Sequence, residues 1–215
     1  MFLDRRDAGR ALATRLERHR HTDAVVLGVT RPGVVVADEV ARTLGLPLDV
    51  TVLRRVAAGA DDLGVVGEDG VERLRPAAAA SDAAPAIDRA RRIAAAIAER
   101  FRHGRPARDL TGRTAIVVDD GIRTGLAMAA ACAIARARGA ATVIAATPVG
   151  PAADAPTPDG ADELVSLRRP AAVPPRTAVY ATCPVVSDAE VERIAAEWPS
   201  SRVTRVARPV RRGAR

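Results

Sequence analysis

Residues 115–127 constrain the fold more than any other segment of this chain. Four apolar residues, Ala115 to Val118, run directly into two acids and a glycine-containing turn. Small residues then continue from Gly125 to about Arg138, where a helix is predicted. A short, continuous apolar run is typical of a strand that is buried on both faces. The segment therefore predicts a strand, a turn and a helix, the unit from which parallel α/β sheets are built.

The rest of the chain repeats this alternation. Apolar residues recur at three- and four-residue intervals in the predicted helices, and the predicted strands are short apolar runs. Strands joined by helices indicate an α/β fold with a parallel sheet, helices on both faces and right-handed crossovers. The Gly-rich residues 57–76 predict a flexible loop or loose hairpin. The predicted strands are 24–29, 48–56, 115–118, 142–147 and 163–167, and the predicted helices are 4–16, 34–44, 82–101, 125–138 and 188–198.

Length and charge predict one domain with a tail. A chain of 215 residues suits one well-cored domain, which we place at residues 1–198. The formal net charge is +7, but residues 199–215 form an Arg-rich tail, and its six arginines leave 7 − 6 = +1 for the rest. All the basic residues are Arg, as a GC-rich coding sequence would produce. Nucleic-acid binding is not expected, since aromatic residues make up only 2% of the chain and offer few surfaces on which bases could stack.

The expected location is the cytoplasm. Cys132 and Cys183 lie far apart and have no metal-ligand spacing, which fits a reduced intracellular protein. Asp4, Arg5, Arg6, Asp7 and Arg10 lie in the N-terminal segment, where a signal peptide needs an apolar core. No apolar run reaches the length of a membrane span.

The turn after residue 118 predicts a phosphate site beside a sugar site. It lies at the carboxyl end of a strand and the start of a helix, where backbone N–H groups are unpaired and the helix dipole is positive. Gly121 and Gly125 allow close approach, and Thr124 adds a hydroxyl donor. Asp119 and Asp120 would repel a phosphate, so ribose hydroxyls or hydrated Mg²⁺ are their expected partners. A sugar between two phosphate groups would satisfy both demands.

This segment resembles the phosphoribosyl-pyrophosphate motif of type I phosphoribosyltransferases. The match consists of the four apolar residues, the two acids and Gly-x-x-Thr-Gly. The resemblance extends to residues 4–10, 27–33, 67–70 and 161–163 and covers roughly nine-tenths of the chain. It implies the type I fold with a small hood and a flexible loop. It also implies transfer of the phosphoribosyl group to a nitrogenous base, with release of pyrophosphate, Mg²⁺ assistance and a homodimer.

The resemblance assigns roles residue by residue. Asp119 and Asp120 would hold the ribose hydroxyls and, with Arg55, form the catalytic set. Arg55 would reach the pyrophosphate, Arg31 and Gly33 would form its loop, and residues 57–76 would act as a lid. No direct protein metal site is implied, because Mg²⁺ would be carried by the substrate, with Asp119 and Asp120 nearby. The 5′-phosphate cradle would be Gly121, Ile122, Arg123, Thr124, Gly125, Leu126 and Ala127.

Several departures from the motif keep other functions open. Ala127 replaces a Thr or Ser, Leu126 replaces a small residue, and Pro32 replaces a glycine and removes one N–H donor. Arg123 stands where some purine-salvage relatives have a carboxylate that can act as a general base. The chain could therefore be a weakened or inactive regulatory protein that binds phosphoribosyl pyrophosphate or a nucleotide. Alternatively, it could bind nucleic acid through its Arg tail. Arg55 could also be an ordinary solvated strand end, and residues 57–76 an ordinary loop.

Overall fold

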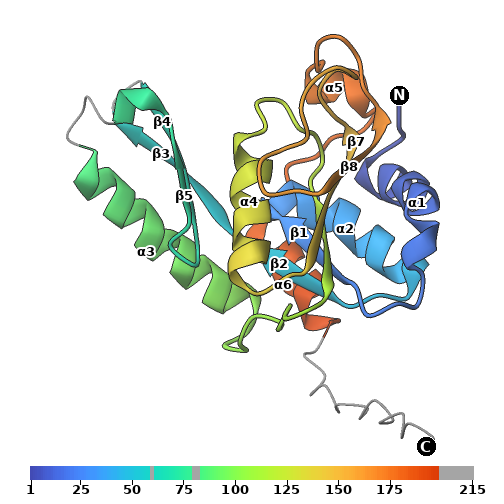
Figure 1. Cartoon of the computed structure of the whole chain (residues 1–215), viewed down its shortest axis with the longest axis horizontal. Coiled ribbons are helices and arrows are strands. Elements are labelled where there is room, and N and C mark those ends of the chain that lie inside the picture. Colours follow the sequence, from blue (N-terminus) through green and yellow to red (C-terminus); the bar gives the residue numbers. More distant parts are fainter. Residues whose placement is uncertain (59–60, 79–82, 199–215) are drawn as a thin grey trace, which may run out of the picture.

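The computed structural model describes residues 1–58, 61–78 and 83–198, so the Arg-rich tail lies outside the described residues. Five parallel strands form the central sheet in the order β2-β1-β6-β7-β8 (Figure 1). The predicted parallel sheet with helices on both faces is confirmed. Its strands are β1 (Val25–Val29), β2 (Leu48–Thr51), β6 (Thr114–Val118), β7 (Thr142–Val149) and β8 (Glu163–Arg168).

Alternate residues of each central strand enter two different cores. On β6, Ile116 and Val118 pack among residues of α1, α2 and α6, whereas Ala115 and Val117 pack among residues of α4. Both faces of the strand are apolar because both are covered, which explains why the sequence shows continuous apolar runs. The helices are α1 (Arg5–Arg15), α2 (Thr30–Leu44), α3 (Ala84–Phe101), α4 (Leu126–Ala137), α5 (Arg176–Val179) and α6 (Asp188–Ala196), with 3₁₀ turns at Glu17–His19 and Pro76–Ala78.

A second, antiparallel sheet and α3 project from the body as an arm (Figure 1). Its strands are β3 (Leu53–Ala58), β4 (Asp61–Gly67) and β5 (Glu72–Leu74). The single strand predicted at 48–56 was wrong: it divides around Val52, and its two halves join different sheets. On β4, Leu63 and Val66 pack toward α3, while Val65 joins the core beside α4. The arm therefore has an inner face turned toward the body.

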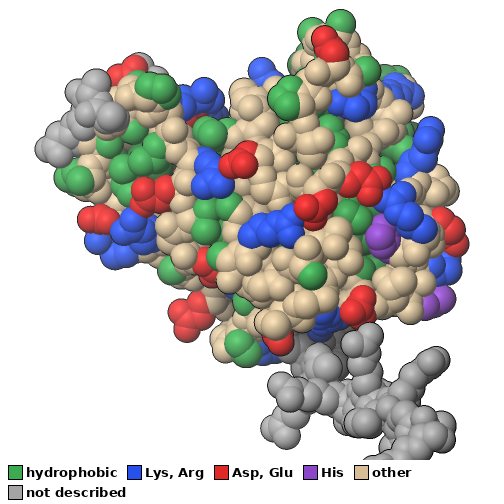
Figure 2. All heavy atoms as spheres, in the orientation of Figure 1, with side chains coloured by type: hydrophobic (Ala, Val, Ile, Leu, Met, Phe, Trp, Pro, Cys, Tyr) green, Lys and Arg blue, Asp and Glu red, His purple; other side chains and the backbone are tan. Residues whose placement is uncertain are grey.

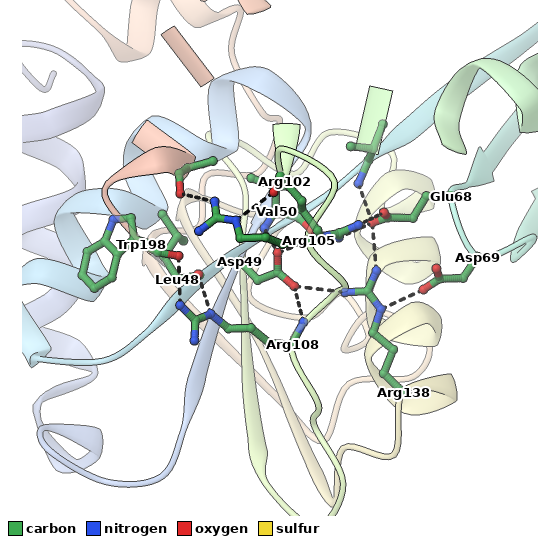
Figure 3. Close-up of polar contacts among 12 residues, drawn as sticks. Leu48, Asp49, Val50, Glu68, Asp69, Arg102, Arg105, Arg108, Arg138 and Trp198 are labelled. Carbon is green, nitrogen blue, oxygen red and sulfur yellow. Dashed lines mark hydrogen bonds and ion pairs between the residues drawn. The ribbon is translucent and has the colours of Figure 1, made fainter. Parts of the chain in front are cut away.

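A buried ionic cluster holds the base of the arm to the body. We call Asp49, Glu68, Arg102 and Arg138 the base cluster. Figure 3 shows the Glu68 carboxylate between the guanidinium groups of Arg102 and Arg138, which follow α3 and α4. Asp49, on β2, accepts a hydrogen bond from Arg102 Nε at 2.9 Å. Because β2, α3, α4 and the β4–β5 turn all meet here, the cluster fixes the arm against the central sheet.

The surface carries charges of both signs. Figure 2 shows arginines and acids interspersed over the visible face. This distribution agrees with the small net charge that remains when the tail is left out. Among the described residues, no helix has the length and apolar character needed to cross a lipid bilayer.

Candidate active site

The turn between β6 and α4 is fixed by bonds to the neighbouring strand. The N–H of Asp119 donates to the Ala146 carbonyl at 3.2 Å, and the N–H of Ile122 donates to the Val149 carbonyl at 2.9 Å. Gly125 has a φ of 74°, which favours glycine, and a Cβ added there would meet nothing within 4 Å. No side chain caps α4. The first N–H groups of this helix therefore face open space, as an anion site requires.

A pocket of about 340 Å³ lies over this turn. The turn and the start of α4 form one wall, and the inner face of the arm forms the opposite wall. Packing of the arm against α4 thus brings β3 and β4 to the turn between β6 and α4, although they lie more than fifty positions away in sequence. The lining residues are Arg55, Asp62, Val65, Arg75, Asp119, Gly121, Ile122, Arg123, Thr124, Gly125, Leu126, Ala127, Met128 and Arg176.

The two adjacent acids have different surroundings. Asp119 lines the pocket and is half-buried, and one of its carboxylate oxygens accepts the N–H of Asp120 at 2.8 Å. Burial, followed by the charge of Asp120, raises the pKa of Asp119 to about 8. Asp120 is only 1% exposed and is not among the residues that line this pocket. The structure therefore presents one of the two predicted sugar-binding acids to the pocket and holds the other beneath it.

Three residues that the sequence did not single out surround Asp120. Its carboxylate accepts hydrogen bonds from Arg5 Nε at 3.1 Å and from Arg176 Nε at 2.9 Å. The Tyr180 hydroxyl donates to the Asp120 carbonyl at 2.6 Å. Arg5 lies within the N-terminal segment that resembles the family, which is the one sequence signal that could have indicated it. Arg176 and Tyr180 come from a Pro-rich region without a distinctive pattern.

The junction between β1 and α2 lies against the same turn. Thr30 is β-branched and yet has a φ of 53°, a conformation that costs free energy and is often kept at functional sites. A Cβ at Gly33 would lie 2.8 Å from the Val118 carbonyl oxygen and 3.0 Å from Asp119 Cα. Only glycine allows this contact, which places the predicted pyrophosphate loop beside the predicted sugar-binding acid.

A second pocket of about 360 Å³ opens beside this junction. Thr30 and Arg31 line it on one side and β3 on the other, and Arg55 lines both this pocket and the first one. Arg31 is held by an ion pair with Asp188 at the start of α6. The side chain of Arg55 is 75% exposed and pairs with Asp62 at 2.6 Å. The predicted pyrophosphate-binding arginines thus face one cavity from two elements.

Comparison with known proteins identifies the family. The family model described as the phosphoribosyl transferase domain matches residues 3–169, which include both pocket-forming turns. The chain belongs to the phosphoribosyltransferase family. The resemblance inferred from the sequence is confirmed, and the five-stranded parallel sheet is the fold expected for a type I phosphoribosyltransferase.

Individual relatives within the family agree with this assignment. The chain is 46% identical over 186 residues to "Putative phosphoribosyl transferase Rv0571c" of Mycobacterium tuberculosis H37Rv and to its counterpart in strain CDC 1551. These matches cover 80% of this chain but 41% of the relatives, so the chain spans about two fifths of their length. The crystal structure of TT1426 from Thermus thermophilus is 38% identical, with a TM-score of 0.74, and the match covers 92% of this chain and 99% of that one.

The first pocket presents the Asp119 carboxylate as a group that could contact a Mg²⁺ ion. Among the described residues, no group of three or more His, Cys, Asp or Glu side chains is placed to hold a metal ion. The Asp119 carboxylate faces the pocket, and carboxylate oxygen is a ligand that Mg²⁺ prefers. Asp120 already accepts hydrogen bonds from two arginines. One protein carboxylate could therefore join ligands supplied by a sugar and a pyrophosphate.

Proposed function

We propose that this chain binds phosphoribosyl pyrophosphate across the two pockets and transfers its phosphoribosyl group to a nitrogenous base, releasing pyrophosphate. The observation that carries the proposal is the arrangement around the 340 Å³ pocket. It combines the open N-terminus of α4, the Asp119 carboxylate and an arginine from the arm. The helix N-terminus would bind a phosphate, the carboxylate would bind a sugar diol, and the arginine would bind a pyrophosphate.

The 5′-phosphate is assigned to the start of α4. Backbone N–H groups of residues 125–127 and the Thr124 hydroxyl would donate to its oxygens, and the helix dipole favours the negative charge. Asp119 would accept hydrogen bonds from the ribose hydroxyls. The pyrophosphate would lie between Arg31 and Arg55, which line the second pocket. In this assignment Arg55, which lines both pockets, would lie between the ribose 5-phosphate part of the substrate and its pyrophosphate.

The reaction needs positioning more than protein nucleophiles. The lone pair of a base nitrogen forms a bond to the anomeric carbon, and the bond from that carbon to pyrophosphate oxygen breaks, so pyrophosphate leaves with the electron pair. Positive charge that develops on the sugar would be stabilised by the ionised Asp119. Arg31 and Arg55 would stabilise the negative charge on the leaving group. Bound Mg²⁺ would neutralise charge on the pyrophosphate, with Asp119 as its protein contact.

Asp120 is assigned a supporting role. Its side chain is held by Arg5 and Arg176, and its carbonyl is held by Tyr180. In this arrangement Asp120 would fix the backbone that carries Asp119, whereas the sequence motif assigned both acids to the ribose. A direct contact of Asp120 with ribose would require Arg176 to release it.

Calorimetry of phosphoribosyl pyrophosphate binding, with and without Mg²⁺, tests the proposal. We expect Mg²⁺-dependent binding that Asp119→Asn abolishes and Arg55→Ala weakens. Asp88→Asn is the matched control, because this exposed residue of α3 does not line either pocket. If the wild-type chain does not bind, or if the Asp119 and Asp88 variants behave alike, the proposed site is wrong.

A second candidate function is ligand binding without turnover. Ala127 gives the phosphate wall a methyl group in place of a hydroxyl, and Pro32 lies in the first turn of α2 without an N–H to donate. The loss of such donors costs on the order of 1.5–3 kcal/mol each when the acceptor is charged. Restoring them in Pro32→Gly and Ala127→Thr variants should raise donor affinity or turnover. Unchanged affinity and rate would show that neither departure matters.

The homodimer implied by the family resemblance also stays a proposal. Light scattering of the purified chain, at concentrations above and below the micromolar range, would test it.

A further inference from the structure

We propose that the acceptor is a nitrogen heterocycle that carries a carboxylate, and that Arg123 selects it. The proposal rests on the function proposed above and names the class of the second substrate. It concerns the side chain of Arg123, whereas the 5′-phosphate is assigned to backbone groups and Thr124.

Arg123 is a cation that has no partner among the residues that the structure describes. It is exposed, lines the 340 Å³ pocket, and forms no hydrogen bond or ion pair within residues 1–58, 61–78 and 83–198. Each of the other three arginines in the pocket has a carboxylate. Arg55 and Arg75 share Asp62, at 2.6 and 3.5 Å, and Arg176 pairs with Asp120 at 2.9 Å.

An apolar wall lies beside this unpaired cation. Four apolar residues, Val65, Ile122, Leu126 and Met128, are among those that line the same pocket. Apolar walls with one or a few placed polar groups are typical of sites for flat organic ligands. Leu126 in particular supplies the aliphatic surface that a smaller residue would lack. A planar ring against this wall, with its carboxylate toward the guanidinium of Arg123, would satisfy both features.

The two carboxylates that line the pocket do not pair with Arg123. No histidine is among its described lining residues, and its two carboxylates are Asp62 and Asp119. Asp62 is held between two arginines, which lower its pKa through the hydrogen bond from Arg55 and through their charges. Asp119 is assigned to the ribose. Arg123 therefore keeps its charge available to a carboxylate on the acceptor.

Two pairs of ligands that differ in charge test the proposal. Nicotinate is compared with nicotinamide, and orotate with uracil. Their affinities are measured by calorimetry in the presence of ribose 5-phosphate, and their turnover is measured with phosphoribosyl pyrophosphate and Mg²⁺. We expect the wild-type chain to prefer the carboxylate member of at least one pair by roughly tenfold to a hundredfold, the range of one charge-assisted hydrogen bond.

Variants of Arg123 separate selection from general binding. Arg123→Leu should bring the ratio of carboxylate to neutral affinity close to one, and Arg123→Lys should restore part of the preference. Arg92→Leu is the matched control, because Arg92 is exposed on α3 and lines neither pocket. This variant should keep the wild-type ratio.

The possible failures can be told apart. Phosphoribosyl pyrophosphate that binds while neutral bases are preferred would overturn the acceptor class and leave the proposed function standing. A variant Arg123→Leu that weakens donor binding without changing the ratio would show that Arg123 serves the donor, which would also overturn the inference. If the donor does not bind to the wild-type chain, the proposed function falls, and the inference that rests on it falls too.

Discussion

Replacing Glu68 with Gln should lower the free energy of unfolding by about 3 kcal/mol, because it removes one charge from the buried base cluster. The Glu68 side chain is 3% exposed and contacts both Arg102 and Arg138, the latter at 2.9 Å. Its Oε1 also accepts the N–H of Val52 at 3.2 Å, at the point where β2 gives way to β3. Breaking a buried ion pair costs about 3–5 kcal/mol. We expect the lower end because Asp49 still holds Arg102.

Urea unfolding followed by circular dichroism would measure this loss, which corresponds to a melting temperature lower by roughly 10 °C for a domain of this size. Glu163→Gln is the matched control. Glu163 pairs with Arg18 at the surface, where the two side chains are 45% and 50% exposed, so its loss should cost less than about 1 kcal/mol. The claim that the base cluster stabilises the junction of arm and body would be refuted if the two substitutions lowered the free energy of unfolding equally. This comparison holds when both variants keep the wild-type dependence of that free energy on urea concentration.

Four further predictions concern the site itself. The pKa of Asp119 is raised to about 8, so the folded chain binds a proton there that the unfolded chain releases near pH 4, and stability falls as the pH rises between these values. Asp119→Asn should therefore raise the free energy of unfolding at pH 8 by more than about 1 kcal/mol, and urea unfolding that shows no increase would contradict this. The affinity of the wild-type chain for phosphoribosyl pyrophosphate should rise from pH 6 to pH 8, because Asp119 ionises over this range. An affinity that calorimetry finds independent of pH would contradict the second prediction. Gly33→Ala should destabilise the chain by about 1–3 kcal/mol in urea unfolding, because its Cβ would press on the Val118 carbonyl; a smaller loss would mean that the backbone yields. Arg5→Met should lower the melting temperature and weaken donor binding, because Asp120 loses a buried partner; retained binding would show that Asp120 does not position the turn.

Local sequence patterns were sufficient for the parallel α/β architecture and for the strand, turn and helix around residues 115–127. Residues 115–118 are apolar at every position because both faces of β6 are covered, and that local signal requires no knowledge of distant contacts. Gly125 could likewise be recognised, because its left-handed backbone conformation belongs to the turn itself. The strand at 48–56 was predicted with the wrong boundaries. Its β propensity continues through Val52, and only packing against two different sheets separates β2 from β3.

Which residues work together at the site depends on tertiary packing. In sequence Asp119 and Asp120 are equivalent neighbours, yet Arg5 and Arg176, more than fifty residues away on either side, hold one beneath the pocket and leave the other facing it. The same holds for Arg55, which faces the turn between β6 and α4 because the arm packs against α4. Side chains that are so far apart in sequence pair only because of how helices and strands pack. A local sequence pattern therefore cannot predict which of them will pair. The turn could be recognised from the chain, but its partners are set by the fold.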